Sequence, residues 1–260
     1  DCIPLATMSI FKYLIVASGC RILCGIIETA IAESVTKGRF ENMRNTKFQK
    51  FFAAGCVLAA FVLWTALVRL ADVRPIGPMG SCVGLASFNQ WVHDLTGVSM
   101  TLYTVTDWLS LLPFACMLGF AILGLVQWIR RKSLLRVDHD VLLLGGFYLA
   151  VAAVYLFFET VVINCRPILI EGVLEASYPS STTVLVLCVM PTAIMQFRRR
   201  IRHPMLRRWV CLLSGTFTVF MTVGRLLSGV HWITDIIGGI LISCGLVLLY
   251  DAAVRCCAKQ

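Results

Sequence analysis

Six long apolar stretches, separated by short polar links, dominate the pattern of the chain. They cover residues 51–68, 108–129, 141–158, 183–197, 209–224 and 232–250. Each is near the roughly 20 residues that an α-helix needs to cross a bilayer. The fourth is short and contains Pro191, which leaves its ends open. We therefore predict an all-α fold, a bundle of six transmembrane helices.

Positively charged residues recur in alternate links. Clusters precede the first span, separate the second from the third and the fourth from the fifth, and follow the sixth. With six spans, all four clusters fall on one side of the membrane. Lys and Arg are enriched in cytoplasmic loops. We therefore expect an integral protein of the plasma (cytoplasmic) membrane with both termini in the cytoplasm.

Residues 1–42 do not fit this pattern. Their apolar stretch, 13–32, is interrupted by Arg21 and Glu28, and a charge at mid-membrane is costly. We interpret 1–42 as an amphipathic N-terminal extension, or as an artefact of where the gene was taken to begin. The six-span domain would then cover 43–255, and 256–260 would form a cytoplasmic tail.

Composition agrees with a membrane protein. The chain is 58% hydrophobic and 14% charged, with a mean hydropathy of +0.84, whereas globular domains are about 25% charged. The basic residues behind the net charge of +9 sit mainly in short clusters between apolar runs, which does not favour a nucleic-acid partner. Most of the twelve cysteines lie in apolar runs, where cysteine acts as a small hydrophobe. Cys82 and Cys165 both lie on the outer side, and a disulfide between them remains an alternative.

The longest outer link, 71–107, contains Gly and Pro residues that mark turns. Between those turns, Phe88, Trp91 and Val92 favour a short helix at the membrane interface.

Candidate chemistry gathers in the stretch GRLLSGVHWITDIIGG, residues 224–239. His231 and Asp235 are four residues apart, a spacing that puts two side chains on one face of a helix. A carboxylate in that position fixes the imidazole tautomer and leaves the other ring nitrogen as a nucleophile or base. Arg225, at the end of the preceding span, reaches the same point if the intervening turn is tight.

Two further outer segments supply partners for an anion. Arg166 follows the third span, and SYPSSTT at 177–183 precedes the fourth. Together with Arg225 they provide two guanidinium groups, hydroxyls and turn amides. This set suits a tetrahedral oxyanion such as phosphate.

These motifs resemble the type-2 phosphatidic acid phosphatase / haloperoxidase superfamily. The similar elements are Arg-x5-His-x3-Asp at 225–235, Arg-Pro at 166–167 and Pro-Ser-Ser at 179–181, and the six spans match its membrane branch over about 45–252. The resemblance implies that His231 attacks phosphorus and forms a phosphohistidine, and that Asp235 orients it. It also implies a phosphate pocket and no metal or cofactor. That pocket would consist of Arg166, Arg225, Ser180, Ser181 and Thr182.

The chain departs from the family at three positions. Glu159 replaces a lysine, Thr182 replaces the histidine that acts as general acid, and Gly224 replaces a serine. General acid catalysis contributes about 10²–10⁴-fold, so we expect either a diphosphate substrate, whose phosphate leaves readily, or an acid from elsewhere. Glu159 and His93 are possible auxiliary residues, although Glu159 could instead pair with Arg166. The outer-side candidates for a substitute acid are His93, Asp94, Glu171 and Glu175.

We predict a lipid-phosphate or polyprenyl-diphosphate phosphatase that takes its substrate from the outer leaflet. Its partners would be that lipid and the bilayer. Two alternatives stay open: a catalytically degenerate relative that binds lipid headgroups, and a lipid phosphotransferase. A transporter is not favoured, because the charged residues gather at one face and form no pair at the midplane.

Overall fold

A computed structural model describes residues 43–257. The predicted N-terminal extension, 1–42, lies outside the described residues. Of the described residues, 47–257 belong to one compact unit, and side chains are described from Gln49 onward.

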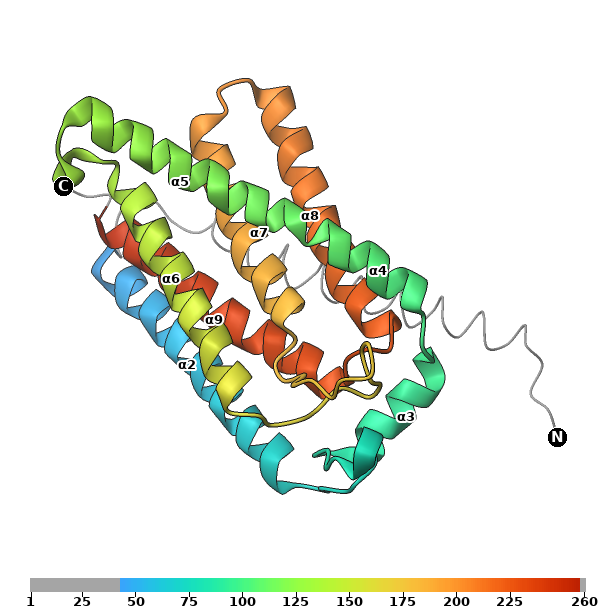
Figure 1. The fold of residues 1–260 in the computed structure, drawn as a ribbon. Coiled ribbons are helices and arrows are strands. Elements are labelled where there is room, and N and C mark those ends of the chain that lie inside the picture. The colour runs from blue at the N-terminus through green and yellow to red at the C-terminus, as the bar shows by residue number, and fades with distance from the viewer. Residues whose placement is uncertain (1–42, 258–260) are drawn as a thin grey trace. The chain divides into compact units, whose positions relative to one another are not determined.

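Six helical segments are long and apolar enough to cross a membrane (Figure 1). They are α2 (Met43–Leu70), α4 with α5 (Met100–Leu109 and Leu111–Arg131), α6 (His139–Thr160), α7 (Ser181–Arg200), α8 (Pro204–Leu227) and α9 (Ile233–Cys257). Between residues 43 and 257 there is no β-strand, only isolated bridges. The prediction of an all-α, six-span fold is confirmed.

The second span begins earlier than the sequence predicts, at Met100 rather than at 108. Asp107 interrupts the apolar pattern, but its carboxylate lies 2.9 Å from Nη2 of Arg225. This partner allows the carboxylate to remain within a span. The helix breaks at Ser110, whose hydroxyl donates to the Asp107 carbonyl at 2.6 Å. Pro113, which has no N–H to donate, lies in the first turn of α5.

The 71–107 link contains the predicted short helix as α3 (Ala86–Thr96), after a 3-10 turn at Pro78–Gly80. A second 3-10 turn, Leu134–Arg136, lies between α5 and α6.

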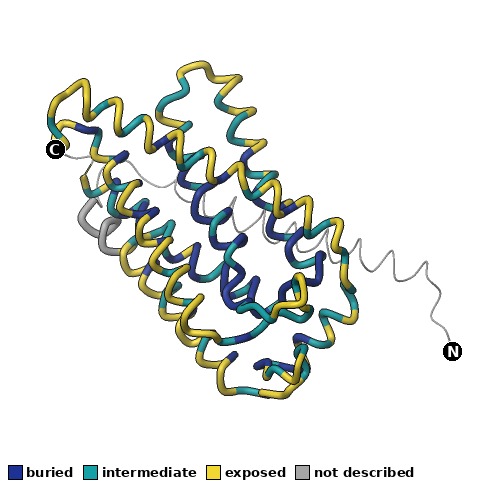
Figure 2. Tube along the Cα trace, viewed as in Figure 1, coloured by how far each residue is buried: buried dark blue, intermediate teal, exposed yellow. Residues whose placement is uncertain are grey.

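Helix α7 is the most buried span and packs against α5, α6, α8 and α9. Figure 2 shows this helix and the start of α9 as the darkest part of the trace. Pro191 lies in the middle of α7, yet the helix continues; neighbouring helices commonly allow this in membranes. The large exposed side chains on the outer helices, such as Leu63, Leu118 and Leu149, suit contact with lipid.

The basic clusters are joined by ion pairs where the helices end. Arg131 lies 2.8 Å from Asp138, in the link before α6. Arg200, at the end of α7, lies 3.2 Å from Asp140. Lys50 of α2 lies 2.7 Å from Asp251 of α9. The links that the sequence assigns to one side of the membrane therefore contact one another.

Candidate active site

His231 and Asp235 form a close pair where α8 passes into α9. His231 lies two residues before α9 begins, so the pair is not on one helix as the spacing suggested. Asp235 Oδ2 accepts a hydrogen bond from the backbone N–H of Trp232 at 3.0 Å and lies 3.7 Å from His231 Nδ1. Asp235 is the third residue of α9, and a carboxylate there that accepts the N–H of the residue before the helix makes a capping-box contact. The same oxygen thus stabilises the start of α9 and faces the imidazole.

The imidazole of His231 is 2% exposed. Burial holds its pKa below the ordinary 6.5, and the positive charges of Arg166 and Arg225 lower it further, against the opposing effect of Asp235. The ring is therefore neutral at neutral pH. A neutral imidazole keeps a lone pair for attack on an electrophile.

A buried polar layer from the 71–107 link and from the loop between α6 and α7 fixes the pair. Asn164 donates to Asp235 Oδ1 at 3.5 Å and accepts from the Gly84 N–H at 3.1 Å. Asn89 of α3 exchanges two hydrogen bonds with Thr234, at 3.0 and 3.2 Å. Segments far apart in sequence therefore set the position of the His–Asp pair.

Arg225, in the last turn of α8, is almost fully buried. Its Nη2 lies 2.9 Å from Asp107 Oδ1 and donates to the hydroxyl of Thr182. The guanidinium carbon lies 5.0 Å from the centre of the Tyr103 ring, a distance typical of cation–π contact. Its Nε and Nη1 are buried and have no hydrogen-bond partner among the described residues.

Arg166 lies in the loop that connects α6 to α7. Its Nε is 2.9 Å from Glu175 Oε2, without hydrogen-bond geometry, and its Nη1 also lacks a partner within 43–257. The alternative that Glu159 pairs with Arg166 is wrong. The loop doubles back, so that the Arg166 N–H donates to the Glu175 carbonyl at 3.0 Å and brings that carboxylate alongside.

The side chains of the YPSSTT segment, residues 178–183, lie in two different environments. Ser180 is buried away from the cavity: its N–H donates to the Asp235 carbonyl at 3.2 Å and its hydroxyl accepts from Thr183 at 3.0 Å. Ser181 and Thr182 line a cavity instead. Tyr178 packs on α9 at Gly238, where a Cβ would lie 2.6 Å from the ring.

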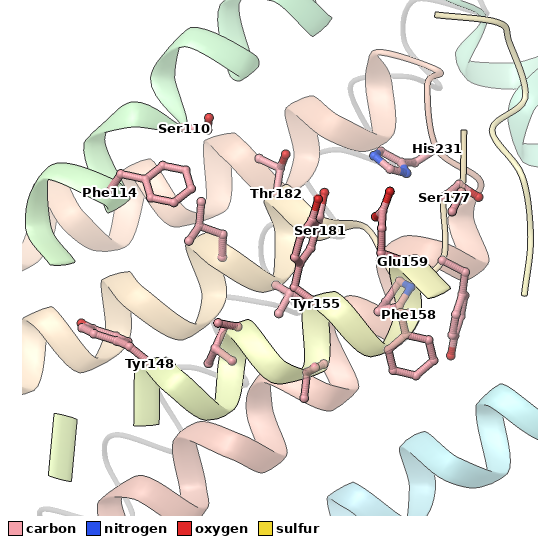
Figure 3. A pocket seen from close by; sticks show the side chains of 18 of the residues that line it. Ser110, Phe114, Tyr148, Tyr155, Phe158, Glu159, Ser177, Ser181, Thr182 and His231 are labelled. Atoms are coloured by element: carbon pink, nitrogen blue, oxygen red, sulfur yellow. The ribbon is translucent and has the colours of Figure 1, made fainter. Parts of the chain in front are cut away.

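The cavity, of about 410 Å³, lies between α5, α6 and α7 and is lined mainly by apolar side chains. Its polar end contains His231, Ser181, Thr182 and Glu159 (Figure 3). The carboxylate of Glu159 points toward His231 in this view. The imidazole therefore lies at the polar end of a mainly apolar cavity.

The structure does not bring His93 to this cavity. Its Nε2 lies 3.3 Å from the Gly229 carbonyl, and its ring packs 5.4 Å from that of Trp232. Among the candidate acids, Asp94 accepts a hydrogen bond from Gln90 at 2.7 Å.

Cys82 and Cys165 are free thiols, so the disulfide between them that the sequence analysis left as an alternative is not formed. The described residues include no group of three metal-ligating side chains.

Sequence reasoning missed Asp107, Asn89 and Asn164 as parts of the site. Asp107 carried a signal, because a charge at the edge of an apolar run needs a partner. The two asparagines carried none, since polar residues are ordinary in loops.

The arrangement pairs a buried imidazole with a carboxylate, and the positive charges of two arginines act on that imidazole. The sequence model of the PAP2 superfamily matches residues 114–255, so the chain belongs to the PAP2 superfamily. This confirms the family that the motifs indicated.

Among solved structures, the chain is similar to the first transmembrane PAP2-type phosphatidylglycerolphosphate phosphatase from Bacillus subtilis. The TM-score is 0.54 and the identity 18%, over 80% of this chain and 97% of that chain. At this identity the match shows the shared fold. The comparison with curated proteins gives no match.

Proposed function

We propose that this protein is a membrane phosphatase that hydrolyses a lipid phosphate, or a polyprenyl diphosphate, through a phosphohistidine at His231. One observation carries the proposal. Four buried nitrogens of Arg166 and Arg225 make no hydrogen bond within the described chain, and both charges act on the neutral imidazole. Buried polar groups in proteins are almost always hydrogen-bonded. Phosphoryl oxygens are the partners that suit these guanidinium groups.

The chemistry follows from the placement of these groups. Nε2 of His231 attacks phosphorus while Nδ1 faces Asp235, whose negative charge stabilises the imidazolium that forms. The two guanidinium groups stabilise the charge that develops on the phosphoryl oxygens. Ser181 and Thr182 lie at the same end of the cavity and add hydroxyl donors. Water then releases phosphate from the histidine.

The membrane placement belongs to the same proposal. Lys and Arg are enriched in cytoplasmic loops, so we assign the links that contain the basic clusters to the cytoplasm. The candidate site lies at the opposite ends of the spans. Substrate would enter from the outer leaflet of the plasma membrane, with its hydrocarbon tail in the cavity between α5, α6 and α7.

A second candidate, headgroup binding without turnover, is supported by the partners of the arginines. Asp107 and Glu175 each lie 2.9 Å from one guanidinium group. These carboxylates compete with phosphate and offset part of the positive charge.

Phosphate release from detergent-solubilised protein and a defined lipid phosphate separates the two candidates. We expect the wild-type protein to release phosphate, and His231→Ala to abolish both release and an acid-labile phosphoenzyme. His139→Ala, at an exposed histidine at the start of α6, is the matched control and should retain activity. Lipid binding without release would establish the binder, and a new phosphorylated alcohol would indicate a phosphotransferase. Undiminished release by His231→Ala would refute the mechanism.

A further inference from the structure

The proposed reaction still needs a proton donor for the departing lipid alcohol. Thr182 stands where the family resemblance implies a histidine acid, and its hydroxyl accepts a hydrogen bond from Arg225. A threonine hydroxyl does not act as an acid at neutral pH. The inference below rests on the proposed function and concerns which side chain donates this proton.

Among the described residues that line the cavity, one side chain other than His231 has the acidity required. The titratable residues in its lining are His231, Glu159 and three tyrosines. A tyrosine phenol ionises near pH 10, and burial raises the pKa of Tyr178 further. The hydroxyls of Tyr148 and Tyr178 are also engaged, with Thr192 at 3.2 Å and Thr65 at 2.7 Å. His231 is the nucleophile, which leaves Glu159.

The other outer-side carboxylates that the sequence offered are engaged elsewhere or lie off the cavity. Glu175 lies beside Arg166, Asp94 accepts from Gln90, and Glu171 belongs to a turn that does not line the cavity. Glu159, in the last turn of α6, makes no ion pair or hydrogen bond with any described residue. Its carboxyl group points toward His231 across the polar end of the cavity (Figure 3).

We propose that Glu159 is the general acid and base of this phosphatase, in place of the histidine that the family pattern has at position 182. A carboxyl group can donate a proton to a leaving oxygen and, as a carboxylate, take one from water. The Glu159 side chain lines the same cavity as His231 and points toward it.

The two half-reactions balance around this proton. His231 Nε2 forms a bond to phosphorus as the bond from phosphorus to the lipid oxygen breaks, and that oxygen takes the proton of the Glu159 carboxyl. The lipid alcohol leaves, and phosphohistidine and the Glu159 carboxylate remain. The carboxylate then takes one proton from the attacking water, the phosphorus–nitrogen bond breaks, and phosphate departs from neutral His231.

Dependence on the leaving group tests this role. Glu159→Gln preserves the shape of the side chain but cannot donate a proton as an acid. With a long-chain alkyl phosphate, we expect kcat to fall by about 10²–10⁴-fold. With p-nitrophenyl phosphate, whose nitrophenolate leaves without a proton, the formation of phosphoenzyme should be nearly unchanged, which also verifies that the variant is folded.

Asp94→Asn is the matched control, since it removes an outer-side carboxylate that does not line the cavity. It should leave the turnover of both substrates unchanged. Glu159→Asp should retain part of the alkyl phosphate activity that Glu159→Gln loses. Equal losses of phosphoenzyme formation on the two substrates, or no loss on either, would refute the role of Glu159. Wild-type protein that turns over neither substrate would instead reject the phosphatase function itself.

Discussion

At the scale of single residues, the proposed function gives Asp235 a role in the chemistry, and its contact with the start of α9 gives it a role in folding. Its Oδ2 accepts the Trp232 N–H and faces the His231 ring. Asp235→Asn keeps an oxygen that can accept this hydrogen bond but removes the charge that stabilises imidazolium. We expect kcat to fall by about 10²–10⁴-fold with little change in the melting temperature. Asp235→Ala should lower both, because it also removes the helix cap. Thermal melts beside turnover assays would measure the difference, and equal melting losses in the two variants would contradict it.

The depressed pKa of His231 makes a prediction about pH. Burial is the main cause, and the folded protein therefore keeps this ring neutral below pH 6.5, where the unfolded chain takes up a proton. The unfolded state then binds more protons, so stability rises with pH in this window. The contribution of His231 to the free energy of unfolding is fully present above about pH 6.5 and is lost as the pH falls below that value.

Melting temperatures measured across this range should show that loss in the wild type. They should show less of it in His231→Asn, which carries no titratable ring. Parallel curves for the two proteins would mean that His231 is not held neutral by the fold.

At the scale of elements, the packing of α9 against the 178–182 segment positions Ser181 and Thr182 relative to His231. A Cβ at Gly238 would lie 2.6 Å from the Tyr178 ring. We expect Gly238→Ala to destabilise the protein by about 1–3 kcal/mol and to reduce activity, because it pushes the segment away from His231. Gly215→Ala is the matched control, since a Cβ there meets nothing within 4 Å. A Gly238→Ala protein as stable and active as this control would show that the contact is dispensable.

The spans could be predicted because a bilayer imposes one simple requirement, a long apolar helix. The prediction was wrong at the start of the second span, where Asp107 breaks the pattern and its partner Arg225 is 118 residues away. Arg225, His231 and Asp235 could be found together because they are close in sequence. The pairing of Arg166 with Glu175 depends on a loop reversal, and the Asn89–Thr234 contact joins residues 145 apart. Such contacts leave no periodic trace in the sequence.

At the scale of the whole molecule, the proposed function implies that the orientation of the six spans decides which leaflet supplies the substrate. Two free, exposed cysteines can report it: Cys82 follows α2 in the 71–107 link, and Cys257 ends α9. We expect a membrane-impermeant maleimide to modify Cys82 in intact cells, and Cys257 only after the membrane is permeabilised. Mass spectrometry of the two peptides would measure this, with Cys82→Ser as the control for the outer signal. The reverse labelling pattern would turn the site toward the cytoplasm, and a lipid of the inner leaflet would then have to be its substrate.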